Sequence, residues 1–371
     1  MENYLIEVRD LIVRFYTYAG VVEALDRVNL KIKPGEILGL VGETGCGKSV
    51  TSLSILRLVP PPGKIKEGKV LFNKDGKIIE LMSLNTESMR RIRGKEIAMI
   101  FQEPRAYLNP VYTVEEQIGE ALLLHRREEF LKRALKTLEE SGRNSSFEGQ
   151  IYRRMLRKPN SLITKIMAKF CSKKTLREEI HKEVVRLLKE VEIADPERVT
   201  KMYPFELSGG MAQRVLIAMA LSSHPIMLIA DEPTTNLDVT VQAQILHLIK
   251  QLRENYKSSI LYITHDLGVV AELCDRVAVM YAGNIVEVAD VYELFKNPLH
   301  PYTRGLLESI PRPDKEFKSI PGTVPSLIDP PKGCRFHDRC QFAKTLCKRI
   351  KPKFIEVEKD HYVACHLYGD Q

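Results

Sequence analysis

The sequence has no apolar run long enough to cross a membrane and no export signal at its start. A helix that spans a bilayer needs about 20 consecutive apolar residues, and no apolar run in this chain approaches that length. Residues 1–10 also lack the basic stretch followed by an apolar stretch that marks a secretory signal peptide. We therefore expect the chain to stay in the cytoplasm, where membrane association requires partners or a surface patch.

Net positive charge is absent outside one segment. The net charge is +8, but residues 125–175 hold 14 Lys and Arg against five Asp and Glu, which leaves the rest of the chain near neutrality. This basic segment also lacks the interleaved aromatic side chains on which bases stack, so we do not expect nucleic-acid binding. The length of 371 residues, with 44% hydrophobic and 28% charged residues, predicts a globular protein of two units.

Residues 42–49 carry the strongest motif. They read Gly-Glu-Thr-Gly-Cys-Gly-Lys-Ser between a short apolar run and a helical stretch. Glycines in such a loop let successive N–H groups face phosphate oxygens, while Lys48 bridges the β- and γ-phosphates and Ser49 ligates Mg²⁺. The motif therefore predicts a nucleotide-binding loop. Its expected contact residues are Gly42, Glu43, Thr44, Gly45, Cys46, Gly47, Lys48, Ser49 and Val50.

Two apolar runs, 226–230 and 259–264, flank a helical stretch, a pattern typical of a parallel sheet covered on both faces. Ligands bind at the carboxyl ends of such strands. Asp231 and Glu232 follow the first run, and His265 follows the second. We expect Asp231 to hold Mg²⁺, Glu232 to orient or deprotonate the attacking water and His265 to face the γ-phosphate. The alternative for the acidic pair is a simple helix N-terminus.

Two further polar positions fit the same site. Gln102 follows a third strand-like run and could reach Mg²⁺ or the attacking water. Residues 208–210, Ser-Gly-Gly, form a second glycine loop before an apolar helix and could hold phosphate as well. Taken alone, this second loop would be an ordinary turn and helix cap.

In combination these motifs resemble the ATP-binding-cassette (ABC) ATPases over residues 1–300. The resemblance implies an α/β fold: a P-loop NTPase (RecA-like) core with an antiparallel β subdomain and an α-helical subdomain. It also implies ATP and Mg²⁺ as ligands and an aromatic residue near Phe15 that stacks on adenine, with Tyr16 and Tyr18 as rivals. The residues that it assigns outside the 42–50 loop are Gln102 (Q-loop), Ser208, Gly209 and Gly210 (signature loop), Asp231 (Walker B), Glu232 (catalytic carboxylate), Asp238 (D-loop) and His265 (switch histidine).

Segments 101–110, 206–211, 297–303 and 320–327 are similar to the dipeptide/oligopeptide importer ATPases in particular. Met211 replaces the glutamine common in other cassettes, as in this family. Asn236, in the D-loop, departs from the small residue that is usual there in this family. The expected division is an ATPase domain over 1–300, with a helical subdomain and basic insert over about 114–205, and a C-terminal domain over 301–371.

The importer resemblance implies a subunit that hydrolyses ATP at the cytoplasmic face of the membrane to energise uptake of di- or oligopeptides. Its partners would be a homologous second ATPase in a head-to-tail dimer, two transmembrane permease subunits and, indirectly, an extracytoplasmic substrate-binding protein. In that dimer, Ser208, Gly209 and Gly210 of one subunit complete the site of the other. The alternatives are the same class of importer carrying oligosaccharides or nickel, and a soluble ABC ATPase acting on nucleic acid or ribosomes.

The insert offers a possible lipid contact. Within 143–174, one helix face would be apolar at 162, 163, 166, 167 and 170, with Lys165 and Lys169 on the other. That pattern suits a helix lying on anionic headgroups. The favoured alternative is that this helix packs on the helical subdomain and that its charges are solvated.

Four of the seven cysteines fall in the last 38 residues, namely Cys334, Cys340, Cys347 and Cys365. Reduced thiols clustered in this way point to metal ligation, either at a tetrahedral Zn²⁺ site or on an iron–sulfur cluster. The importer resemblance favours a structural [4Fe–4S] cluster over Zn²⁺. Ordinary buried cysteines are one alternative, and a mixed ligand set that includes His337, His361 or His366 is another.

Overall fold

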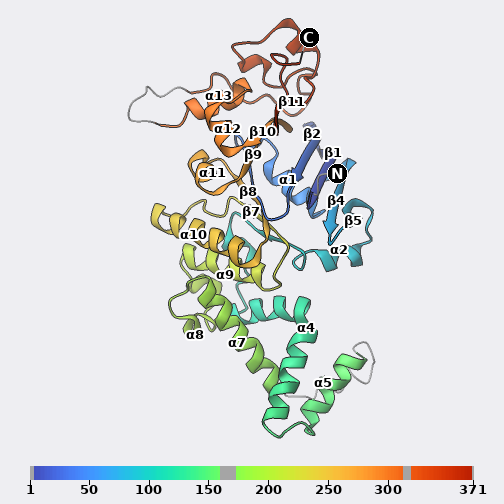
Figure 1. The fold of residues 1–371 in the computed structure, drawn as a ribbon, viewed down its shortest axis with the longest axis vertical. Helices are drawn as coiled ribbons and strands as arrows, with labels where there is room; N and C mark the ends of the chain where they lie inside the picture. Colours follow the sequence, from blue (N-terminus) through green and yellow to red (C-terminus); the bar gives the residue numbers. More distant parts are fainter. Residues whose placement is uncertain (1–3, 159–172, 312–318, 370–371) are drawn as a thin grey trace. The chain divides into compact units, whose positions relative to one another are not determined.

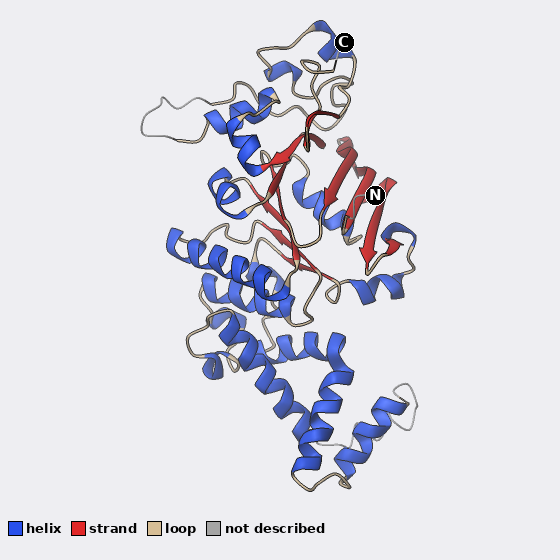
Figure 2. Ribbon diagram, viewed as in Figure 1, coloured by secondary structure: helices blue, strands red, loops and turns tan. Residues whose placement is uncertain are grey.

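The computed structural model describes residues 4–158, 173–311 and 319–369. The chain divides into two compact units. The first consists of residues 1–93, 226–232 and 246–371, and the second of residues 94–225 and 233–245. Figures 1 and 2 show their helices and strands, and each unit is described below by itself.

A largely parallel sheet forms the centre of the first unit. Strand β3 (Ile37–Val41) pairs in parallel with β8 (Ser259–Thr264) and β9 (Arg276–Tyr281), and β8 pairs in parallel with β7 (Met227–Asp231). Every residue of β3, β7 and β8 is buried, as expected for strands covered on both faces. The apolar runs at 37–41, 226–230 and 259–264 are therefore strands, as predicted, and their carboxyl ends share one edge.

The same sheet continues into the C-terminal part of the chain. Strand β10 (Asn284–Asp290) pairs antiparallel with β9 and with β12 (His361–Val363), which pairs in turn with β11 (Ile355–Glu358). The proline-rich stretch after residue 300 thus leads back to the sheet. The short helices of this unit are α1 (Lys48–Ile55), α2 (Thr86–Ile92), α11 (Leu267–Leu273), α12 (Val291–Lys296), α13 (Pro301–Glu308) and α14 (Thr345–Arg349).

A second, antiparallel sheet in the first unit has the order β2-β1-β4-β5. Its long strands alternate buried and exposed residues, which is why one face packs inward. The strands are β1 (Ile6–Thr17), β2 (Gly20–Ile32), β4 (Gly63–Lys74) and β5 (Lys77–Glu80). This sheet is the antiparallel β part that the sequence predicts.

The second unit is mainly helical. Its long helix α4 (Val114–Glu140) begins at a capping box, in which the Thr113 hydroxyl accepts from the Glu116 N–H and the Glu116 carboxylate accepts from the Thr113 N–H. Its other elements are β6 (Ile97–Ile100), α3 (Pro104–Tyr107), α5 (Phe147–Arg157), α7 (Lys174–Glu190), α8 (Pro196–Val199) and α9 (Gly209–Leu221). Helix α10 (Val239–Tyr256) crosses the division between the units near residue 245.

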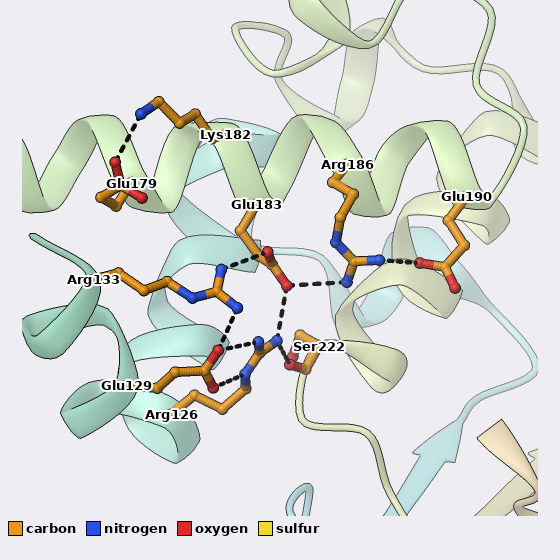
Figure 3. Close-up of polar contacts among 9 residues, drawn as sticks. All are labelled: Arg126, Glu129, Arg133, Glu179, Lys182, Glu183, Arg186, Glu190 and Ser222. Carbon is orange, nitrogen blue, oxygen red and sulfur yellow. Dashed lines mark hydrogen bonds and ion pairs between the residues drawn. The ribbon is translucent and has the colours of Figure 1, made fainter. Parts of the chain in front are cut away.

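Helices α4 and α7 are joined by a network of charged side chains (Figure 3). The carboxylate of Glu183, which is only 5% exposed, accepts hydrogen bonds from Arg126, Arg133 and Arg186, each at 3.0 Å. Burial alone would raise the pKa of Glu183, but the hydrogen bonds from Arg186, Arg133 and Arg126 outweigh it and lower the pKa to about 2. Glu129 accepts from Arg126 as well, which completes the network.

The basic insert lies only partly within the described residues. Its helix α5 buries Ile151, Tyr152 and Met155 within the second unit and leaves Phe147 half exposed. The predicted amphipathic face at 162–170 lies outside the described residues. Among the helices that the structure describes, none combines the length and the apolar character that a membrane span requires.

Candidate phosphate-binding site

The loop after β3 has the backbone geometry of a phosphate-binding loop. Gly42, Gly45 and Gly47 adopt φ angles of 155°, 79° and 108°. A Cβ at Gly42 would lie 2.1 Å from the carbonyl oxygen of Met280, so only glycine fits there. Helix α1 begins directly after Gly47, and no described side chain caps its first turn. Its N–H groups can therefore bind an anion.

Lys48 is held across this loop. Its Nζ donates to the carbonyl of Gly42 at 2.7 Å and to that of Glu43 at 3.2 Å, and the residue is only 5% exposed. A buried ammonium needs such partners. The side chain of Cys46 is buried as well, and burial raises the pKa of its thiol. Thr44 and Gly45 form the exposed tip of the loop.

A candidate magnesium site lies between the loop and β7. Ser49 Oγ, at the start of α1, donates to Asp231 Oδ1 at 3.1 Å. Burial raises the pKa of Asp231, and nearby Glu232 raises it further, while Ser49 and Lys48 lower it. A bound divalent cation would favour the ionised carboxylate. A hydroxyl and a carboxylate, with room left for water and phosphate oxygens, fit the ligand preferences of Mg²⁺.

The ends of β7 and β8 bring Glu232 and His265 together. His265 Nδ1 lies 3.4 Å from Glu232 Oε1. Glu232 has a left-handed φ of 46° and a largely buried side chain, whereas the His265 side chain is 59% exposed. Strained backbone of this kind clusters at functional sites. Three strand-end residues predicted from the sequence, Asp231, Glu232 and His265, thus sit on one edge of one sheet.

The three aromatic candidates for the adenine contact lie on β1 or directly after its end. Phe15, on β1, pairs with Gly63 on β4, and a Cβ at Gly63 would lie only 2.6 Å from the Phe15 ring. Tyr16 is 42% exposed with the amines of two lysines over its ring, and Tyr18 is fully exposed. The expectation for Phe15 stays a prediction, with Tyr16 and Tyr18 as rivals.

The other predicted site residues lie in the second unit. Ser208 caps α9, where its Oγ accepts from the Met211 N–H at 3.2 Å, and a Cβ at Gly210 would lie 2.8 Å from the Val241 side chain. Asp238 caps α10 by accepting from the Val241 N–H at 2.9 Å. Gln102 and Gly209 line a cavity of about 280 Å³ together with Asn236 and Leu237. This unit thus groups the predicted signature loop, Q-loop and D-loop around one cavity.

The four C-terminal cysteines line one small cavity of about 10 Å³. Burial, reinforced by the neighbouring cysteines, raises the pKa of Cys334 to about 12 and that of Cys365 to about 11. Within the described ranges, no three or more His, Cys, Asp or Glu side chains are arranged to hold a metal ion. The donor types suit a metal, but a cavity this small cannot accept a cubane cluster unless the thiols move apart. The prediction of an iron–sulfur or zinc centre is therefore not supported by this geometry.

The histidines nearby are engaged elsewhere. His337 Nδ1 lies 2.8 Å from the Cys334 carbonyl oxygen, and its Nε2 lies 2.9 Å from Asp338. His361 Nε2 lies 2.8 Å from Glu287, and His366 Nε2 lies 2.9 Å from the carbonyl oxygen of residue 350. Among the described residues, no group of three or more His, Cys, Asp or Glu side chains is arranged to hold a metal ion, so the mixed ligand set is also unsupported.

Two residues that contact the phosphate loop were not predicted as site residues. The Glu43 N–H donates to the Tyr302 hydroxyl at 2.9 Å, and the Glu43 carboxylate pairs with Arg339 at 2.8 and 3.0 Å. Tyr302 lies in segment 297–303, whose sequence resembles the importer family but does not by itself indicate a contact with the phosphate loop. No local pattern marks Arg339, because its partner is 296 residues away in the chain.

A phosphate loop between a buried strand and a helix, with a hydroxyl–carboxylate pair beside it and a glutamate and a histidine at neighbouring strand ends, defines a P-loop nucleotide-binding cassette. Residues 25–235 match the family model described as ABC transporter, and residues 286–347 match the model for the oligopeptide/dipeptide transporter C-terminal region. The chain therefore belongs to the ABC transporter family and is an ABC-type ATPase.

Curated relatives match over almost the whole chain. The oligopeptide transport ATP-binding protein OppD of Bacillus subtilis is 44% identical, covering 98% of this chain and 88% of the relative. The dipeptide transport ATP-binding protein DppD of the same organism is also 44% identical, covering 99% and 95%. A probable peptide ABC transporter ATP-binding protein of Sinorhizobium fredii is 45% identical, covering 98% and 95%.

Among solved structures, the fold resembles the ATP-binding cassette MJ0796, a dimer in a post-hydrolysis state bound to ADP and Pi. The TM-score is 0.56 at 24% identity, covering 77% of this chain and 98% of that one. At this identity the likeness concerns the fold alone.

Proposed function

We propose that this chain is the ATP-hydrolysing subunit, located at the cytoplasmic face of the membrane, of an ABC importer that energises the uptake of di- or oligopeptides across that membrane. The observation that carries the proposal is the pairing of a cassette over residues 25–235 with a peptide-transporter type of C-terminal region over residues 286–347. Near full-length relatives named for oligopeptide and dipeptide transport support it.

In this proposal ATP binds with its phosphates on the loop of residues 42–50. The N–H groups of the loop and the first turn of α1 bind phosphate oxygens, and Lys48 Nζ turns from the carbonyls of the loop to the β- and γ-phosphates. Ser49 and Asp231 would hold Mg²⁺, with Gln102 as a further proposed ligand, and the ion would supply positive charge to neutralise the phosphates. These residues bring the γ-phosphorus within reach of the strand ends.

Glu232 is the proposed base. Its carboxylate accepts a proton from the water that attacks the γ-phosphorus, and His265, 3.4 Å away, keeps it in place and contacts the γ-phosphate. Burial raises the pKa of Asp231, and the negative charge on Glu232 raises it further.

We further propose a head-to-tail dimer with a homologous ATPase. Ser208, Gly209 and Gly210 begin α9, a helix of 13 residues whose positive N-terminal end suits an anion. In the dimer this end would face the γ-phosphate held by the other subunit, and Asp238 would line the same interface. Two permease subunits and, indirectly, an extracytoplasmic binding protein would complete the importer.

The C-terminal region carries a separate proposal. We propose a functional division near residue 300, with the four cysteines of the C-terminal part holding a structural [4Fe–4S] cluster, or Zn²⁺ in its place. The four cysteines line one cavity, but among the described residues no three or more His, Cys, Asp or Glu side chains are arranged to hold an ion, so the proposal rests on the clustering of the cysteines alone. Loading would require them to lose protons and separate, which their raised pKa values oppose in the metal-free chain.

Transport assays in proteoliposomes test the cargo. The chain is assembled with its paired ATPase, the permeases and the binding protein, and ATP hydrolysis is measured with peptides, oligosaccharides or nickel. We expect only di- or oligopeptides to stimulate ATP hydrolysis. An assembly that carries the Glu232→Gln variant serves as the control and should show no turnover. Stimulation by nickel or a sugar would replace the peptide assignment. Purification with ribosomes or RNA in place of permeases would overturn the importer assignment.

A further inference from the structure

Glu43, the second residue of the phosphate loop, is held at three of its groups. Its N–H donates to the Tyr302 hydroxyl at 2.9 Å, and its carboxylate accepts two hydrogen bonds from Arg339, at 2.8 and 3.0 Å. Its carbonyl accepts from Lys48 Nζ at 3.2 Å. Glu43 therefore connects the residues that anchor the loop with the lysine that is expected to meet the phosphates.

Both anchors come from the C-terminal part of the chain. Tyr302 lies on α13, is fully buried, and packs against the ring of Tyr281. Arg339 ends a short 3₁₀ helix, and its side chain is only 6% exposed. Its guanidinium lies near the rings of Tyr281 and Phe336 and donates to the carbonyl of residue 321 at 2.9 Å. The guanidinium is thus oriented before it meets Glu43.

We propose that Arg339 is a positioning residue for ATP binding, because it holds the phosphate loop through Glu43. A bidentate arginine–carboxylate pair fixes geometry as well as charge. While the pair is intact, the loop and Lys48 are already ordered when ATP arrives, so binding costs less conformational entropy. Arg339 also neutralises a carboxylate that belongs to the loop on which an anion must sit.

The inference concerns nucleotide binding and is independent of the cargo. It does rest on the proposed phosphate contacts of the loop, so the test includes Lys48→Ala. If Lys48→Ala binds ATP as tightly as the native chain, the proposed site itself fails. If only Lys48→Ala weakens binding and Arg339→Ala does not, the site stands and the positioning role of Arg339 fails.

The main measurement is the Kd of ATP for the full-length chain, by calorimetry, for Arg339→Ala, Arg339→Lys and the double variant Arg339→Ala/Glu43→Gln. For Arg339→Ala we expect about tenfold weaker binding, which corresponds to about 1.4 kcal/mol. The double variant should regain part of this loss, because the carboxylate left without its arginine becomes neutral. Arg339→Lys keeps the positive charge but not the two-nitrogen geometry of the guanidinium, so its affinity for ATP should fall by less than about threefold.

Steady-state kinetics in the assembled importer separate positioning from catalysis. In Arg339→Ala, KM for ATP should rise about tenfold with kcat within about twofold, because Glu232 and His265 do not contact Arg339 in the described structure. The matched control is Lys351→Ala. Lys351 also joins the C-terminal part to the antiparallel sheet, through Asp26 at 2.7 Å, but does not reach the loop. The Kd of ATP for the Lys351→Ala variant should stay within about twofold of the native value.

Three results would overturn the inference. The first is an unchanged Kd in Arg339→Ala at a native melting temperature. The second is a loss in Lys351→Ala as large as that in Arg339→Ala, which would assign the effect to general attachment of the C-terminal part. The third is a double variant that binds ATP no better than Arg339→Ala. If Arg339→Ala fails to fold, Arg339→Lys and Glu43→Gln measured against Lys351→Ala decide in its place.

Discussion

Replacing Glu183 by glutamine tests how the charged network of the second unit stabilises the protein. Three arginines donate to this one carboxylate, which is 5% exposed (Figure 3). The pKa of Glu183 is about 2 in the folded chain, against 4.5 for an ordinary glutamate. Since one pKa unit corresponds to about 1.4 kcal/mol, the ionised carboxylate contributes about 3 kcal/mol at neutral pH.

The pH dependence gives this prediction a definite sign. Because folding lowers the pKa, the contribution is complete above the unfolded value of 4.5 and is lost as the pH falls towards 2. We expect Glu183→Gln to cost about 2–3 kcal/mol at pH 7, since Arg133 and Arg186 are partly exposed to solvent, and only about 1 kcal/mol at pH 3. At pH 3 the carboxyl group is mostly protonated in the unfolded chain, so ionising it on folding offsets most of the gain.

The assay is urea unfolding followed by far-ultraviolet circular dichroism, which reports mainly on the helices of this unit. The matched control is Glu190→Gln on the same helix. Glu190 pairs with the partly exposed side of the network, through Arg186 at 2.9 Å, so this substitution should lower the free energy of unfolding by less than about 1 kcal/mol. A difference between the native chain and Glu183→Gln that stays constant from pH 7 to pH 3 would refute the reasoning. A control as destabilised as Glu183→Gln would refute it as well.

The remaining predictions concern the two candidate sites. Glu232→Gln should bind ATP normally but lower its hydrolysis by about 10²-fold or more, because the proposed base is lost; unchanged phosphate release would remove Glu232 from that role. Lys48→Ala should weaken ATP binding about tenfold or more, seen by calorimetry, because a cationic phosphate contact is lost. Cys340→Ser should lower the iron bound by anaerobically purified protein, measured by elemental analysis and absorbance; equal metal content in variant and native chain would exclude Cys340 as a ligand.

The sequence predicted those parts of the fold that depend on local patterns. Buried parallel strands appear as unbroken apolar runs, so β3, β7 and β8 were placed to within a residue. Strand ends meet at one edge of a sheet, so Glu232 and His265 could be grouped although 33 residues separate them. The spacing of the cysteines in the sequence also predicts that they cluster. It does not predict the geometry of the cluster, because the orientation of the thiols depends on how the C-terminal segments pack.

What the sequence alone determined is the phosphate loop, because glycine spacing, the lysine and the serine act within eight consecutive residues whose backbone follows from local sterics. Only the tertiary structure decided which side chains hold that loop. Arg339 and Tyr302 reach Glu43 across 296 and 259 residues, and Glu183 meets Arg133 across 50. Such pairs carry no periodicity in the sequence, because the contact exists only once distant segments have packed.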